Sequence, residues 1–88
     1  MKTEFKSSFT KDLKKVSSGD VKRQLLEVIA QVENSKNLLE IEHVKKLRGA
    51  ENYYRIRVGD YRLGLKVENN TVIFVRFLDR KDIYRYFP

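Results

Sequence analysis

Apolar residues in the first part of the chain recur at the spacing of a helix. The residues that share one face of this predicted helix are Phe5, Phe9, Leu13 and Val16. Ser7 and Ser8 are suitable capping residues for it, and Lys2–Lys6 is expected to form a short edge strand. A break at 17–20 then separates this helix from a second one.

The second helix is predicted to run to about Asn34. Its apolar stripe consists of Val21, Leu25, Val28, Ile29 and Val32. Two helices joined by so short a turn predict a helical hairpin, and we expect both stripes to pack in the core.

The second half of the chain alternates with period two, as strands do. Tyr53–Val58 and Tyr61–Val67 flank Gly59-Asp60, which is typical of a two-residue hairpin turn. The apolar run Val72–Leu78 is nearly continuous, which favours a central strand. The predicted fold is therefore a single α+β domain spanning 1–88. It has two layers, an N-terminal helical hairpin packed on an antiparallel sheet of three to four strands.

This hairpin turn places basic residues together on the face of the sheet that points away from the helices. The expected pairs on that face are Arg57 with Arg62, Arg55 with Gly64, and Tyr53 with Lys66. Like charges directly opposite one another destabilise a sheet, and a bound anion would relieve this repulsion. Phosphate is a suitable anion because the planar guanidinium of arginine can donate two parallel hydrogen bonds to it. We therefore predict an anion-binding face, with open space above Gly64.

The register of the third strand depends on its loop. A four-residue loop places Phe74 and Arg76 on the helix side, whereas a three-residue loop turns both over and pairs Arg76 with Gly64. We favour the second register because an arginine is easier to place among anion ligands than in a core.

The C-terminal segment alternates charged and aromatic residues. Arg80, Tyr84 and Tyr86 are within reach of the basic face, where tyrosines can stack on RNA bases. Ile83 and Phe87 are instead expected to close the core.

Composition excludes several classes of site. The chain has no cysteine and one histidine, so disulfide scaffolds, thiolate metal sites and multi-histidine zinc sites are excluded. The net charge is +7, and residues 44–88 carry eleven Lys and Arg against five Asp and Glu. This excess predicts a polyanionic partner. No apolar run is long enough for a membrane helix, so we expect a cytoplasmic protein with no membrane partner, metal or small-molecule cofactor.

Three segments resemble the RelE/ParE superfamily of bacterial and archaeal toxins. They are Lys46-Leu47-Arg48-Gly49, the run from Tyr54 to Leu63 (Y-R-I-R-V-G-D-Y-R-L), and the run from Arg80 to Arg85. The resemblance implies a toxin of a type II toxin–antitoxin system, neutralised by an acidic antitoxin with an amphipathic segment. In the RelE branch such toxins enter the ribosome and cleave mRNA without a metal, by attack of a 2′-hydroxyl on the adjacent phosphate.

The same resemblance assigns roles to residues. Arg57, Arg62, Arg80 and Tyr84 match catalytic positions of RelE-type toxins. Further RNA or phosphate contacts are expected from Arg55, Lys66, Arg76 and Tyr86. Because arginine does not release its proton in practice, the base would have to be Tyr84, Tyr86 or a carboxylate. His43 matches no catalytic position of the family and is predicted to be structural.

Two other functions stay open. ParE-like members of the superfamily inhibit DNA gyrase without catalysis, and a degenerate toxin would only bind RNA or its antitoxin. Asp79 lies where relatives often have a histidine or a basic residue, which is why the degenerate alternative stays open.

Overall fold

The computed structural model describes residues 1–88 and contains one five-stranded sheet. The strand order is β1-β5-β4-β3-β2. The elements in chain order are β1 (Lys2–Phe5), α1 (Ser7–Lys14), α2 (Gly19–Asn34), a short 3-10 helix (Leu38–Glu40), β2 (Val44–Lys46), β3 (Tyr53–Val58), β4 (Tyr61–Glu68), β5 (Thr71–Asp79) and α3 (Arg80–Tyr86). None of the α-helices combines the length and the apolar character needed to cross a membrane.

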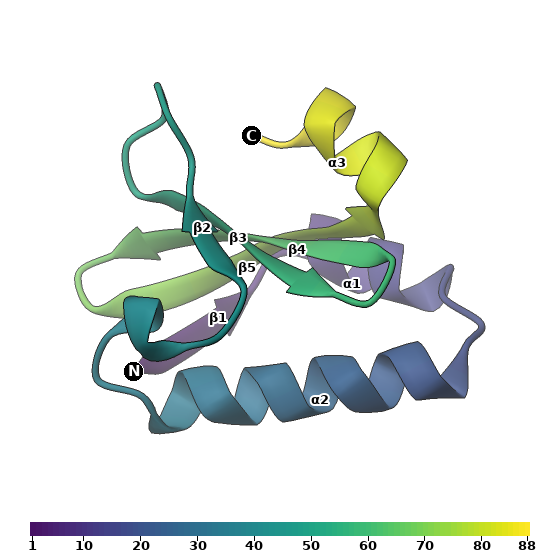
Figure 1. Cartoon of the computed structure of the whole chain (residues 1–88), viewed down its shortest axis with the longest axis horizontal. Coiled ribbons are helices and arrows are strands. Elements are labelled where there is room, and N and C mark those ends of the chain that lie inside the picture. Colours follow the sequence, from purple (N-terminus) through teal and green to yellow (C-terminus); the bar gives the residue numbers. More distant parts are fainter.

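The sheet separates the N-terminal helices from the C-terminal one. The long helix α2 runs along one face, and α3 lies over the opposite face (Figure 1). This confirms the α+β class and the N-terminal helices packed on the sheet. The sheet has one or two strands more than expected, and one of its pairs, β1 with β5, is parallel.

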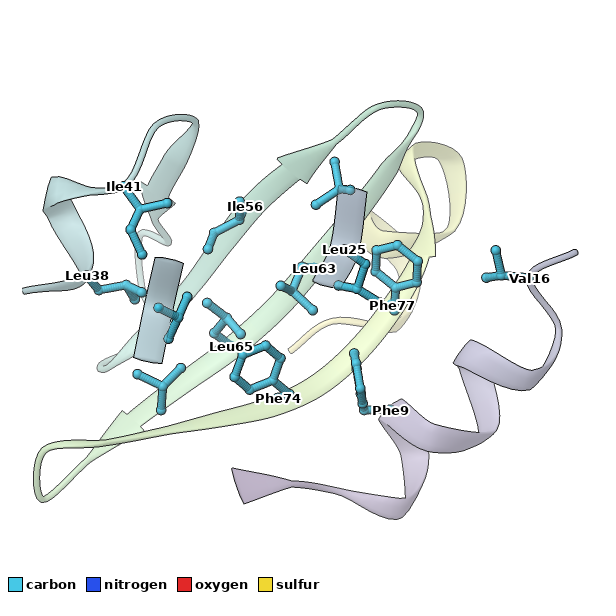
Figure 2. Close-up of a cluster of buried hydrophobic side chains, with 13 residues drawn as sticks. Phe9, Val16, Leu25, Leu38, Ile41, Ile56, Leu63, Leu65, Phe74 and Phe77 are labelled. Atoms are coloured by element: carbon cyan, nitrogen blue, oxygen red, sulfur yellow. The ribbon is translucent and has the colours of Figure 1, made fainter. Parts of the chain in front are cut away.

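The core lies between the sheet and the two N-terminal helices. Phe9 of α1 packs edge-on against Phe74 and Phe77 of β5, with ring centroids 5.6 and 6.4 Å apart (Figure 2). Leu25 and Val32 of α2 are fully buried against the same layer. The predicted stripes of both helices are therefore core positions. The exception is Phe5, which belongs to β1 and is about half exposed.

The first hairpin has the predicted register. Arg57 faces Arg62 and Arg55 faces Gly64 across β3 and β4. Gly59 adopts φ +59° in the turn, a conformation that favours glycine. The apolar partners Ile56 and Leu63 are buried on the helix side, so the arginines are directed to the other face.

The register of the third strand combines the two expected alternatives. The loop is only Asn69-Asn70, and both residues have positive φ, as a tight hairpin turn of this kind requires. From this turn, Leu65 pairs with Phe74, which is buried in the core as the first register implied. A bulge follows, and Gly64 then pairs with Arg76 as the second register implied.

The bulge coincides with the place where β5 loses its neighbour β1. The parallel pairing ends at Phe5 opposite Phe74. Beyond it, the carboxylate of Asp12 in α1 accepts a hydrogen bond from the backbone N–H of Phe77 at 3.0 Å. Asp12 thus satisfies a strand-edge donor that a longer β1 would otherwise have paired.

Two elements were not predicted as such. β2 is three residues long and contains two lysines, so its alternation is too short to reveal a strand. The helix α3 was interpreted only as an alternating tail. Its signal was Asp79, which caps the helix by accepting a hydrogen bond from the N–H of Lys81 at 2.9 Å.

Phe87 occupies the space above Gly64 that we expected to be open. A Cβ placed on Gly64 would come within 2.8 Å of the Phe87 ring, which is almost completely buried. Ile83 and Phe87 are buried as expected, but they pack with α3 on the face of the sheet opposite the main core (Figure 1). The absence of a side chain at Gly64 serves the docking of α3 rather than access for a phosphate.

Replacing Gly64 with alanine is expected to destabilise the protein by about 1–3 kcal/mol, because the added methyl group displaces the Phe87 ring. Urea unfolding followed by circular dichroism measures this loss. The matched control is Gly19→Ala, because a Cβ at Gly19 meets nothing within 4 Å. A Gly64→Ala protein as stable as the control would contradict this packing argument.

Candidate nucleic-acid site

Three arginines form the centre of the candidate site. Arg55 and Arg57 alternate along β3, and Arg62 faces Arg57 from β4; we call these three the arginine cluster. Their side chains share the sheet face that carries α3. No carboxylate forms an ion pair with any of them, so the repulsion within the cluster is not relieved inside the molecule.

Arg62 is fixed to the hairpin turn before any ligand binds. Its Nη1 donates hydrogen bonds to the carbonyl oxygens of Gly59 and Tyr61, at 3.1 and 3.0 Å. Both bonds come from the same nitrogen. The Nε–H and Nη2 edge therefore remains available to an anion, and this edge is the one that forms bidentate contacts with phosphate.

The helix α3 brings Tyr84 and Arg80 to the same region. The guanidinium of Arg55 lies over the Tyr84 ring, 4.5 Å from its centroid, and Tyr84 is about two-thirds exposed. The backbone N–H of Arg80 donates a hydrogen bond to the carbonyl of Asp60 at 2.9 Å, which ties the start of α3 to the hairpin turn.

Two adjoining pockets contain these residues. The smaller has a volume of about 240 Å³ and is lined by His43, Lys45, Arg55, Arg57, Arg62 and Tyr84. The larger, of about 620 Å³, lies between α2 and the hairpin turn and includes Arg80. His43, Arg57 and Arg62 line both. Of the four residues predicted to be catalytic, Arg57 and Arg62 therefore line both pockets, Arg80 lines only the larger and Tyr84 only the smaller.

Lys66 and Tyr86 lie outside both pockets. The ammonium of Lys66 is 2.6 Å from the carboxylate of Glu68, and this hydrogen bond and charge raise the pKa of Lys66. The exposed Tyr86 ring lies 5.9 Å from the guanidinium of Arg76.

Arg76 has a protein partner of its own. Its Nε and Nη2 donate to the buried carboxylate of Asp12 at 2.7 and 3.1 Å. This hydrogen-bonded pair raises the pKa of Arg76. The guanidinium is thus engaged in binding α1 to β5, away from the arginine cluster.

The smaller pocket also contains His43 and Lys45, which are not among the site residues predicted from the sequence. Lys45 faces Arg55 across β2 and β3, and the Nδ1 atom of His43 lies 3.0 Å from Nη2 of Arg57. The pairing of β2 with β3 positions both side chains. This pairing could not be predicted, because a strand of three residues is too short to show alternation in the sequence. No group of three or more His, Cys, Asp or Glu side chains is placed to hold a metal ion.

Comparisons with known proteins agree with this architecture. The family model described as the ParE toxin of the type II toxin–antitoxin system parDE matches residues 3–84. Among curated proteins, the chain is 46% identical to Toxin RelE3 of Methanocaldococcus jannaschii over 89 residues, covering the whole of both proteins.

Solved structures show the same fold. The chain is similar to a RelB-RelE antitoxin-toxin complex from Methanococcus jannaschii, with a TM-score of 0.81, 45% identity and coverage of 97% of this chain and 99% of that one. An archaeal RelE-RelB complex from Pyrococcus horikoshii matches with a TM-score of 0.73 at 24% identity, covering 90% of this chain and 93% of that one, and supports the fold alone. The chain therefore belongs to the RelE/ParE superfamily and is a RelE homologue, a toxin of the type II toxin–antitoxin class.

Proposed function

We propose that this toxin is a ribosome-dependent endoribonuclease that cleaves mRNA without a metal ion. The observation that carries the proposal is the convergence of Arg57, Arg62, Arg80 and Tyr84 on two adjoining pockets. The relative named Toxin RelE3 supports the RelE branch over the others.

The chemistry suits the residues. When a 2′-hydroxyl attacks the adjacent phosphate, negative charge accumulates on the phosphorane oxygens, and donors held in place before the reaction stabilise it. Arg57 and Arg62 supply these donors from the sheet, and Arg80 adds a third from the start of α3. Arg55 holds the neighbouring phosphate, while Tyr84 offers a ring on which a base can stack.

An antitoxin and the ribosome are the proposed partners. The similar structure from Methanococcus jannaschii is a complex of RelE with the antitoxin RelB, which supports an antitoxin for this chain as well. Because the toxin carries +7 net charge, we propose an acidic amphipathic segment that covers the arginine cluster or displaces α3.

Purified toxin added to ribosomes programmed with a known mRNA is expected to cut within the A-site codon, because only the ribosome presents the message to the site. Primer extension maps the cuts. A lane with naked mRNA is expected to show none, and an Arg55→Ala/Arg57→Ala protein serves as the control for contaminating nucleases. Cutting of naked mRNA at the same rate would contradict ribosome dependence.

A second function has one observation in its favour, because the matching family model is that of the ParE toxin. A ParE-like toxin would inhibit DNA gyrase by docking, with the arginine cluster as a contact surface. Absence of cuts in every lane, from a protein that still arrests growth, would favour this alternative.

A further inference from the structure

His43 lies where the two pockets of the candidate site meet. Its backbone follows the 3-10 helix and immediately precedes β2, with φ at +66°. Its carbonyl accepts a hydrogen bond from the N–H of Arg57 at 3.3 Å, which extends the β2–β3 pairing by one step. This pairing places the imidazole beside the Arg57 side chain, about half exposed to solvent.

The guanidinium of Arg57 lies against the imidazole ring of His43. Nη2 of Arg57 is 3.0 Å from Nδ1 and 3.4 Å from Nε2 of His43. A single nitrogen this close to both ring nitrogens lies over the face of the ring, because a lone pair of imidazole points outward in the ring plane, away from the other nitrogen. A neutral imidazole in this arrangement keeps its in-plane lone pair free of Arg57, and it can accept a proton there.

The groups around His43 are mostly cations. Lys45, Arg55, Arg57 and Arg62 line the smaller pocket with it, together with Tyr84 of α3. The acids near it are Glu42, whose carboxylate is 3.9 Å from Nε2, and Glu27 of α2 and Asp60 of the hairpin turn across the larger pocket, where Arg80 also lies. Among the residues of the smaller pocket, only histidine ordinarily changes its protonation near neutral pH.

We propose that His43 is the general base of the cleavage reaction, an inference that rests on the proposed endoribonuclease function. His43 takes the proton of the 2′-hydroxyl as the bond from that oxygen to phosphorus forms. The bond from phosphorus to the 5′-oxygen breaks, and this leaving oxygen takes a proton from the hydroxyl of Tyr84. The products are a 2′,3′-cyclic phosphate and a 5′-hydroxyl, and solvent returns both side chains to their starting state.

Arg57 links substrate binding to the base. In the free protein its Nη2 lies over the imidazole ring, 3.0 Å from Nδ1. A bound phosphate draws the guanidinium fork toward its oxygens, since a charged acceptor makes the stronger hydrogen bond. Arg57 therefore holds the phosphate beside the base.

The variant His43→Asn tests this assignment. Asparagine tolerates positive φ, and its amide oxygen can accept from Arg57 but takes up no proton in the neutral range. We expect the cleavage rate on programmed ribosomes to fall by about 100-fold or more, with ribosome binding unchanged. The wild-type rate is expected to rise with pH as the base loses its proton, and the variant rate to lose this rise.

The outcomes separate this inference from the function on which it rests. If the wild-type protein does not cleave mRNA on programmed ribosomes, the proposed endoribonuclease function is wrong, and the assignment of His43 as its base is wrong with it. If it cleaves and His43→Asn cleaves at the same rate with the same pH profile, the function stands and the base assignment is wrong. Loss of ribosome binding in His43→Asn and in a second variant, His43→Gln, would also overturn it, because His43 would then be a binding contact.

Discussion

Replacing Arg62 with alanine is expected to lower the rate of mRNA cleavage on programmed ribosomes by about 100- to 1,000-fold. Arg62 lines both pockets, directly opposite Arg57. Its Nη1 is already bound to two turn carbonyls, so its remaining edge is oriented before the substrate arrives. A donor that needs no reorganisation contributes more to transition-state stabilisation than a mobile one.

Two matched variants distinguish the role of this side chain from that of its charge. Arg62→Lys keeps the charge but loses the planar fork, so we expect a cleavage rate between wild type and Arg62→Ala. Arg23→Ala removes one charge from an exposed position on α2, where Arg23 pairs with Asp20, and should leave the rate unchanged. Equal losses in Arg23→Ala and Arg62→Ala would show that only net charge matters. Growth arrest that survives Arg62→Ala would favour the gyrase alternative.

The part of the site that could be predicted comes from local rules. Gly59-Asp60 determines the register of the first hairpin, and that register alone opposes Arg57 to Arg62. The location of the arginine cluster follows, because Ile56 and Leu63 must face the core. The residues within this hairpin could therefore be placed from the sequence with the correct partners.

The part that could not be predicted depends on contacts between distant segments. We predict Arg76 as a phosphate contact because an arginine is easier to place among anion ligands than in a core, whereas the structure pairs it with Asp12, 64 positions earlier. A signal was nevertheless present. Asp12 lies three positions after Phe9 and four before Val16, on the apolar side of the predicted helix, and an acid there needs a partner. The position of His43 beside Arg57 could not be predicted for a similar reason, because β2, the strand that positions it, has only three residues.

Replacing Asp12 with alanine is expected to lower the free energy of unfolding by about 2–3 kcal/mol. Asp12 is 5% exposed and receives three hydrogen bonds, two from Arg76 and one from the backbone N–H of Phe77. Its loss leaves a cation and a buried strand-edge donor without partners. The loss should stay below that of a fully buried pair because the Arg76 side chain is 27% exposed and keeps some hydration. Thermal unfolding is expected to shift down by about 10–20 °C.

Unfolding in urea, followed by circular dichroism, measures this loss and its cause. Asp12→Asn retains an acceptor without the charge and should lose less stability than Asp12→Ala. Arg76→Met leaves the carboxylate with only the Phe77 N–H, so the double variant Asp12→Ala/Arg76→Met should lose less than the sum of the two single losses. Simple addition of the two losses would show that the pair does not interact energetically.

The same variants establish whether Arg76 belongs to the phosphate site. Its guanidinium is bound through Nε and Nη2 to a carboxylate that also holds α1 against β5. Releasing it to a phosphate would leave Asp12 buried beside a single N–H. We therefore expect Arg76→Met to be less stable but to cleave mRNA at the wild-type rate at temperatures where it is folded. Lost cleavage without lost stability would instead assign Arg76 to the RNA contacts predicted from the sequence.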